Sequence, residues 1–340
     1  MNKKKIGLAI LASFFVGLLF GTMFVTTNSI SVIMGIKYLS TSDYTILSDG
    51  FCCHAYGTLN FSETNAATVI QNVFNQKPNS VFFKAGDYDL MGATVTAYCP
   101  IIIEGEGRNT VLRNGTLKVV GEGWQSNNIN VVKHIFFEAD GDTICLWFNG
   151  VVHGFVEANV LYHTDFGVGI PLLCLTDCLT IRVRDNWFDG CNTQIIKING
   201  TRPTPQLHII SNNDFGSTLP IPFPTYTYPW EAAAVYIQGS TNWGNTISDN
   251  LGYLAPENIF VYSEAYRTKV KFNQITCGQD NYLINLYGDQ NAVVGNDIIM
   301  DNAKGAIAIR NSNSNANTIE LNNIQGVNYE TTILFTEEDC

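Results

Sequence analysis

Short apolar stretches that run into an asparagine recur along the C-terminal two-thirds of this 340-residue chain. In its fullest form the pattern is aliphatic-x-x-Asn-x-apolar, as in Val156 to Leu161 and Ile319 to Ile324, and it returns every 23 to 37 residues. The asparagines of the pattern are Asn159, Asn186, Asn213, Asn250, Asn273, Asn296 and Asn322. A weaker copy, Val131 to Phe136, has His134 in the asparagine position. A repeat of this length predicts a solenoid of stacked coils.

Each copy is a short β-type stretch followed by Asn, a residue that tolerates left-handed backbone angles and bonds to nearby backbone through its amide. We therefore expect each asparagine to form a sharp corner. Equivalent side chains would then stack about 4.8 Å apart and hydrogen-bond along a column. Rossmann and barrel folds need long amphipathic helices between their strands, and the repeat region has none.

Helical spacing occurs in residues 64 to 76, where Ala67, Ile70, Val73 and Phe74 fall on one face. This helix precedes the first coil, where a solenoid needs a cap over its open end. The domain organisation that we predict is a signal or anchor helix (1 to 28), a tether (29 to 45) and a β-helix domain (46 to 340). Within that domain, residues 46 to 100 form the cap region and residues 101 to 335 the coils.

The chain resembles the parallel β-helix proteins of the pectate-lyase-like (pectin lyase fold) superfamily. The resemblance rests on the asparagine-cornered repeat and on the opening segments Ala67 to Asn72, Val81 to Tyr88 and Ile101 to Leu112. These segments are similar to those of phage tailspikes, polysaccharide lyases and hydrolases, except that Lys84 stands where proline is usual. The resemblance implies an all-β, single-stranded, right-handed parallel β-helix of eight to ten coils. It selects no reaction, because this fold carries lyases, hydrolases, epimerases and non-catalytic adhesins.

Residues 6 to 25 are apolar and follow three lysines, Lys3 to Lys5. As a helix this stretch is long enough to span a bilayer, and the lysines favour a cytoplasmic amino terminus with the remainder exported. The segment predicts an uncleaved membrane anchor, with a cleaved signal peptide and a secreted protein as the alternative. The formal net charge of −11 argues against nucleic acid as a partner. The expected location is therefore extracellular or at the cell surface.

The chain has nine cysteines. In an exported protein we expect some of them to form disulfides, with at least one left over because their number is odd. No closing helix follows the last coil, which leaves an exposed sheet edge and favours a homo-oligomer.

Counting along the coils from the corner residue predicts an acidic column. Measured from His134 and Asn159, Asp140 and Asp165 have the same offset and should be neighbours. When two carboxyl groups lie on adjacent coils, the charge of one can keep the other protonated, so that it can act as a general acid. The candidate catalytic residues are Glu138, Asp140, Asp165 and Asp189. The alternative is that these aspartates only cap backbone amides at turns.

Residues 216 to 230 lengthen one coil and contain several prolines and aromatic side chains. Prolines exclude a regular strand interior, so this segment predicts an exposed loop whose aromatic rings stack on sugars. A lyase would instead need a basic residue near a uronate, and calcium would be its cofactor; otherwise no cofactor is expected. Arg184 also fits a cross-coil salt bridge with Glu157. The candidate substrate-binding residues are His163, Arg182, Arg184, Trp187, Tyr226, Tyr228 and Trp230, with Lys197 as a further basic candidate for a lyase.

Two hypotheses follow for function. The first is an exported, membrane-anchored β-helix that binds a polysaccharide or cell-surface glycan and cleaves it as a glycoside hydrolase or polysaccharide lyase. The second is a non-catalytic adhesive, surface or virion structural protein built on the same β-helix. Whether the chain is an enzyme stays open from the sequence.

Overall fold

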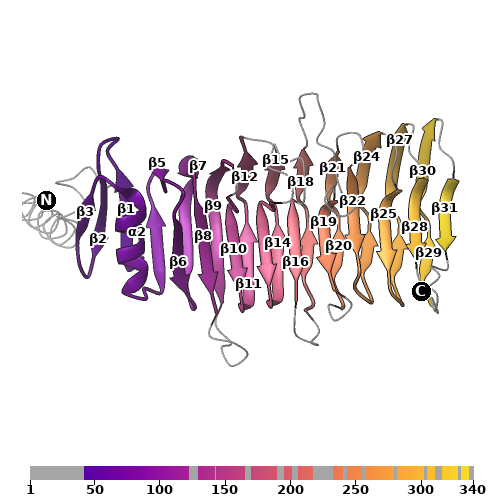
Figure 1. The fold of residues 1–340 in the computed structure, drawn as a ribbon, viewed down its shortest axis with the longest axis horizontal. Coiled ribbons are helices and arrows are strands. Elements are labelled where there is room, and N and C mark those ends of the chain that lie inside the picture. Colours follow the sequence, from indigo (N-terminus) through magenta and orange to yellow (C-terminus); the bar gives the residue numbers. More distant parts are fainter. Residues whose placement is uncertain are drawn as a thin grey trace, which may run out of the picture. The chain divides into compact units, whose positions relative to one another are not determined.

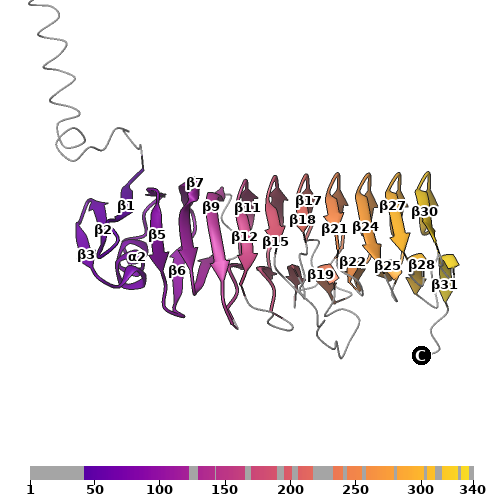
Figure 2. The same ribbon diagram turned by 90° about the horizontal axis from the view of Figure 1, so that it is seen from above.

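The structure is a computed structural model, and it describes residues 42–121, 129–141, 143–164, 170–189, 195–200, 206–216, 233–239, 243–254, 258–278, 282–301, 305–310, 316–327 and 331–336. The expected membrane segment, residues 6 to 25, lies outside these ranges. Within them, no helix combines the length and the apolarity needed to cross a membrane. The compact unit that begins at Asp43 is a parallel β-solenoid whose strands follow one another along a single axis (Figures 1 and 2).

Three antiparallel strands and one helix open this unit. Strand β1 (Tyr44–Ser48) pairs with β2 (Cys53–Gly57), which pairs with β3 (Phe61–Glu63). Helix α2 (Ala66–Asn75) follows, and its first turn is capped by Asn65, whose side chain accepts a hydrogen bond from the Thr68 amide at 3.2 Å. The helix buries its apolar side, as its spacing predicted. It lies at the end of the solenoid nearest β1 to β3 (Figure 1), in the position of the predicted cap. Strand β1 begins at Tyr44, inside the range expected for the tether.

The coils have three strand-bearing sides. We call the first ladder 1; its strands are β4 (Ser80–Phe83), the first half of β7 (Ile102–Arg113), the first half of β9 (Asn130–Ala139), β11 (Val152–Glu157), β14 (Leu179–Arg184), β17 (Ile209–Ser211), β20 (Thr246–Ser248), β23 (Lys269–Lys271), β26 (Ala292–Val294) and β29 (Thr318–Glu320).

We call the second side ladder 2; its strands are β5 (Gly86–Asp89), the second halves of β7 and β9, β12 (Val160–His163), β15 (Trp187–Asp189), β18 (Asp214–Gly216), β21 (Leu251–Tyr253), β24 (Gln274–Gly278), β27 (Asp297–Asp301) and β30 (Asn323–Val327). The third side is a ten-stranded parallel sheet, formed in spatial order by β6 (Thr94–Tyr98), β8 (Thr116–Val120), β10 (Leu146–Asn149), β13 (Leu173–Thr176), β16 (Ile196–Asn199), β19 (Ala233–Gln238), β22 (Ile259–Ser263), β25 (Tyr282–Tyr287), β28 (Gly305–Arg310) and β31 (Thr331–Thr336).

The corner between ladder 1 and ladder 2 carries the predicted asparagine column. The Oδ1 atom of Asn186 accepts hydrogen bonds from both the backbone N–H and the Nδ2 of Asn159, at 3.0 and 3.1 Å. The same pairing repeats from coil to coil as far as Asn322. The side chains from Asn159 to Asn296 in this column are buried, so the column pairs polar groups that would otherwise be costly to bury. The asparagine column covers about seven turns, because the earlier coils lack asparagine at this corner.

One feature of the corner differs from the prediction. The left-handed residue is not the asparagine but the one before it: φ is 52° at Ala158, 58° at Asp185 and 53° at Asn212. His134, with φ of 58°, occupies this preceding position, and the Ile135 amide takes the asparagine's place by donating to Asn159 Oδ1 at 3.1 Å. The bend is thus made one residue earlier, which turns the asparagine side chain inward.

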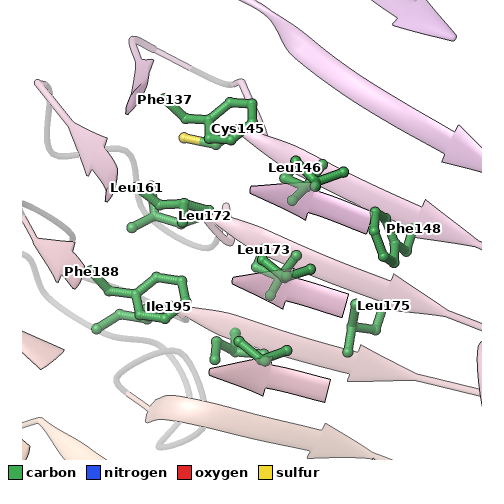
Figure 3. Packing of buried hydrophobic residues seen from close by; sticks show 14 of the residues in the cluster. Phe137, Cys145, Leu146, Phe148, Leu161, Leu172, Leu173, Leu175, Phe188 and Ile195 are labelled. Atoms are coloured by element: carbon green, nitrogen blue, oxygen red, sulfur yellow. The ribbon is translucent and has the colours of Figure 1, made fainter. Parts of the chain in front are cut away.

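The interior consists of apolar columns that run along the solenoid. Phe137, Leu161 and Phe188 are paired by strand register in successive coils, and all three are buried. Figure 3 shows this column beside a second one formed by Leu146 and Leu173. Each coil covers the apolar side chains of its neighbours, which is the main source of stability in a repeat fold.

The six cysteines whose side chains the structure describes form no disulfide, contrary to the expectation. Several are core residues: Cys145 is 1% exposed and Cys178 is 2% exposed. Burial raises the pKa of the Cys53 thiol to about 12 and raises the pKa of Cys178 as well. These thiols act as small apolar side chains within the coils. Cys191 and Cys340 lie outside the described residues.

Candidate functional site

The outward side chains of ladder 2 gather acidic and aromatic residues over four neighbouring strands, β9, β12, β15 and β18. We call this surface the acidic face. Strand register places its side chains in two columns. The first column is Phe136, Val160, Trp187 and Asp214, and the second is Glu138, Tyr162 and Asp189. Alternation along each strand turns the intervening residues, such as Phe188 and Phe215, into the core.

The columns differ from those expected because the corner lies one residue later than His134. Glu138 therefore aligns with Tyr162, and His163 aligns with Ala139. Tyr162 then aligns with Asp189 in the next coil. Glu138 and Asp189 thus share a column, but a tyrosine separates them, so the acidic column is not continuous.

Asp189 has a closer acidic neighbour that the sequence argument missed. Trp187 pairs with Asp214, so Asp189 lies opposite Gly216 in the next coil. Its Oδ1 atom is only 3.4 Å from the position that a Cβ on Gly216 would occupy. A side chain there would be in van der Waals contact with the Asp189 carboxylate, whereas glycine leaves this space open. Asp189 and Asp214 are therefore diagonal neighbours on one face.

The electrostatics of this pair are uneven. Partial burial, together with the nearby negative charge of Asp189, raises the pKa of the Asp214 carboxyl above its ordinary value. A carboxyl group whose pKa is raised in this way holds its proton at a higher pH than an ordinary aspartate does. A raised pKa suits a carboxyl group that acts as a general acid.

A depression of about 460 Å³ opens beside Asp214. Its lining includes Arg108, Asp185, Trp187 and Asp214. The Arg108 guanidinium lies over the Trp187 ring, 4.4 Å from the ring centroid, which fixes the indole and places a cation at the rim. The lining thus holds two carboxyl groups and one guanidinium. An aromatic ring with polar neighbours is a typical surface for a sugar.

Two predicted residues near this face have structural roles. Asp140 is exposed in a turn, where its backbone amide donates to the Thr143 hydroxyl oxygen at 3.1 Å. That hydroxyl donates in turn to the Asp140 carbonyl at 2.6 Å. His163 is buried, and its Nε2 lies 3.0 Å from the Gly141 carbonyl oxygen. Asp165, Tyr226, Tyr228 and Trp230 lie outside the described residues.

The basic candidates lie on other sides of the coils. Arg182 and Arg184 project from β14 in ladder 1, before the asparagine corner. Arg184 forms the predicted cross-coil salt bridge, with its Nη2 and Nε atoms 2.7 and 2.8 Å from Glu157 Oε1. Lys197 belongs to β16 of the ten-stranded sheet, where its Nζ lies 5.7 Å from the centroid of the Tyr236 ring. The structure therefore does not bring these cations together with the acidic face.

Metal ligands are not clustered in the described part of the chain, where no group of three or more His, Cys, Asp or Glu side chains could hold a metal ion. The calcium expected for a lyase thus has no such cluster there to bind it, and we derive no chemistry through it.

The sequence did contain a signal for Asp214. It directly follows Asn213, so it holds the same place in its coil as Trp187 does after Asn186. The signal was missed because carboxylates were aligned with one another rather than with aromatic residues. Arg108 had no signal of this kind, because it precedes the asparagine repeat and reaches Trp187 across two coils.

Comparisons with known proteins agree with the architecture. No family model matches the chain, and no curated protein matches it. Among solved structures it is similar to ORF18 of Geobacillus virus E2, with 13% identity and a TM-score of 0.47 over 80% of this chain. The chain spans 58% of the length of ORF18, which is less than two thirds.

Two other solved structures have similar scores. One is a mannuronic acid specific polysaccharide family 6 lyase from human gut microbiota, with 12% identity, a TM-score of 0.44 and coverage of 79% of this chain and 80% of that chain. The other is PfbA, a surface adhesin of Streptococcus pneumoniae, with 10% identity, a TM-score of 0.40 and coverage of 78% and 89%. The parallel β-solenoid confirms the fold that the resemblance to the pectate-lyase-like superfamily implied. A likeness this distant concerns fold alone.

Proposed function

We propose that this protein binds a polysaccharide across the acidic face and hydrolyses it there. The observation that carries the proposal is the pair Asp214 and Asp189 beside Trp187, in which Asp214 has the raised pKa. Trp187 supplies the surface on which a sugar ring packs, and the polar rim bonds its hydroxyls. The proposal also includes three further features. The solenoid winds right-handed, the protein is exported, and residues 6 to 25 attach it to a membrane.

In the proposed reaction, protonated Asp214 donates its proton to the glycosidic oxygen as the bond to the anomeric carbon breaks. Ionised Asp189 accepts a proton from the water molecule that attacks this carbon. Diagonal neighbours on adjacent strands lie about 7–8 Å apart, with a somewhat shorter distance between their Cβ atoms. That separation favours the inverting geometry, in which the two carboxyl groups leave room for a water.

The charge of the depression favours a neutral glycan over a uronate polymer. When Asp214 carries the proton that the reaction needs, Asp185 and Arg108 balance in the lining, so the depression has no net positive charge to attract a polyanion. The positions of the basic residues favour a hydrolase over a lyase. The basic candidates Arg182 and Arg184 lie in ladder 1, away from the acidic face, and Arg184 is paired with Glu157.

A test uses the full-length chain, incubated with a panel of neutral and acidic polysaccharides, with new reducing ends and unsaturated products measured together. Asp214→Asn should lower the rate of reducing-end release by about 10²–10⁴-fold, the usual contribution of a general acid. Asp189→Asn should have a comparable effect.

The control is Asp297→Asn. Asp297 holds the equivalent place after Asn296 on ladder 2, where its Oδ1 accepts a hydrogen bond from Asn323 at 2.9 Å. Equal loss in all three variants would point to damaged folding rather than to lost chemistry. Unsaturated products would instead establish a lyase. Retention of activity in Asp214→Asn would contradict the role of Asp214 as the general acid.

Non-catalytic binding is the second candidate, and one observation favours it. Tyr162 lies between Glu138 and Asp189, and its ring is 6.3 Å from that of Phe136, so aromatic side chains interrupt the acidic residues along the face. A non-catalytic protein of this kind should bind a polysaccharide without releasing reducing ends or unsaturated products. Trp187→Ala should abolish this binding.

A further inference from the structure

We infer that the protein has a second glycan-binding site, on the corner where the ten-stranded sheet turns into ladder 1. A depression of about 290 Å³ lies there, lined by Trp243, Tyr266, Arg267, Asp289 and Gln290. These residues come from three successive coils, just before β20, β23 and β26. The acidic face lies beyond the opposite end of ladder 1, so the two sites are separate, and this inference does not depend on the proposed hydrolysis.

Two aromatic side chains form the apolar part of the site. Trp243 and Tyr266 face each other in adjacent coils through a parallel β-bridge, and Tyr266 is 39% exposed. Tyr266 lies across Gly288 of the next coil, where an added Cβ would meet its Cδ1 atom at 3.0 Å. Because position 288 has no side chain, the ring can lie against the backbone. An exposed ring and a half-buried ring on successive coils form a platform of the size of a sugar unit.

Backbone geometry fixes the polar part of the site. Arg267 and Gln290 both have left-handed backbone angles, with φ of 56° and 60°, at equivalent places in adjacent coils. The Arg267 amide donates to the Asp289 carbonyl at 3.0 Å, and its Nε donates to Gln290 Oε1 at 2.7 Å. The guanidinium also lies over the Trp243 ring, 5.1 Å from its centroid. The side chains are therefore positioned before any ligand binds, which lowers the entropy cost of binding.

The composition of the lining indicates the ligand class. Arg267 and Asp289 carry opposite charges, so the site has no net charge to select an anion or a cation. A guanidinium, a carboxylate and an amide offer both donors and acceptors around an aromatic platform. This combination suits the hydroxyl groups and the apolar face of a neutral sugar ring. The ligand that we infer is a neutral polysaccharide.

The experiment measures retardation of the full-length chain in native gels that contain hydroxyethylcellulose, galactomannan, dextran or glycogen. Trp187→Ala serves as the background, so that binding by the acidic face does not hide the second site. In this background we expect Tyr266→Ala to weaken binding by at least about tenfold, as loss of one stacking ring does. Tyr266→Phe, which keeps the ring, should retain binding. Arg267→Asn keeps a residue that tolerates the left-handed angle and should weaken binding severalfold.

The matched control is Phe272→Ala, which removes an aromatic ring that is 57% exposed at the asparagine corner, away from this site. It should leave retardation unchanged. Three results would each overturn the inference: no retardation of the Trp187→Ala background by any of the four polymers, retardation that survives both Tyr266→Ala and Arg267→Asn, or equal loss in Phe272→Ala. Release of reducing ends by the single variant Tyr266→Ala tests the hydrolase separately, since that variant retains the acidic face.

Discussion

The two corners that flank ladder 1 share a backbone geometry but differ in their side chains. Both bend the chain through a left-handed residue, with φ of 52° at Ala158 on the asparagine corner and 55° at Thr180 on the other. At the asparagine corner the following residue is asparagine in seven coils. At the other corner, which we call the mixed corner, the equivalent positions include Asn130, Ile181, His208, Asn245, Thr268, Asn291 and Asn317.

The difference lies in how completely each corner pairs its buried polar atoms. Each interior asparagine of the column is bonded through Oδ1 and Nδ2 to both neighbouring coils, as at Asn213. At the mixed corner, Asn245 accepts from the His208 amide at 3.1 Å, but its Nδ2 has no partner among the described residues. A shared backbone bend therefore tolerates varied side chains, and only the uniform column builds a continuous hydrogen-bond network.

The largest expected effect comes from breaking that network. Asn213→Ala removes the acceptor for the Asn186 amide and leaves that buried N–H unpaired, together with the Val183 carbonyl. Each buried group left without a partner costs about 1–3 kcal/mol, so we expect a loss of about 3–5 kcal/mol in the free energy of unfolding. Asn245→Ala at the mixed corner should cost about 1–2 kcal/mol. Urea denaturation followed by circular dichroism measures both, and equal losses would contradict the comparison.

An intermediate effect comes from His208, which takes the place of an asparagine at the mixed corner. Its Nδ1 accepts from the Ile181 amide at 3.0 Å, and its Nε2 lies 3.2 Å from Gln206 Oε1. Burial lowers the pKa of His208 in the folded protein to about 3, whereas an unfolded histidine has a pKa near 6.5. The unfolded chain therefore binds more protons between these values. Stability falls as the pH drops from 6.5 towards 3, by about 1.4 kcal/mol per pH unit.

His208→Asn removes this titration and keeps an acceptor for the Ile181 amide. At pH 7 the variant should lose about 1 kcal/mol, because Gln206 loses its partner. At pH 4 it should be more stable than the original chain. The measurement is the urea midpoint of both proteins between pH 4 and pH 8. Parallel profiles with no crossing would show that His208 does not limit acid stability.

These corners also explain how much of the fold could be predicted. A column of asparagines at fixed spacing is visible in the sequence, and it predicted the solenoid and its core correctly. The mixed corner was not visible, because isoleucine, histidine, threonine and asparagine share no letter pattern although they share a backbone geometry. His134 was wrongly assigned to the asparagine position for the same reason. The left-handed bend accepts Ala158, Asp185 or Phe272, so residue type does not identify it.

The candidate site was only partly predictable for the same reason. Trp187 and Asp189 follow a marked corner, and the structure places both on the acidic face. A one-residue error in register at His134 then paired Asp140 with Asp165, because neighbouring offsets on a strand face opposite sides. Asp214 was missed for another reason, since carboxylates were aligned with one another rather than with Trp187. Arg108 and the Trp243–Tyr266 pair depend on contacts across coils of unequal length, which spacing along the sequence does not encode.

The smallest expected effect comes from the left-handed residues themselves. An L-residue in this conformation costs about 1–2 kcal/mol, while glycine there costs about 0.5–1 kcal/mol in extra chain entropy. Ala158→Gly and Thr180→Gly should therefore each stabilise the fold, by less than about 1 kcal/mol. Both residues keep their backbone bonds, from Ala158 N to Arg184 O at 3.2 Å and from Thr180 N to Gln206 O at 2.6 Å. The gain should be larger at Thr180, because a β-branched residue is the more strained there. Thermal unfolding midpoints rank the two variants, and a loss of stability in either one would mean that the strain at that corner is already relieved by its neighbours.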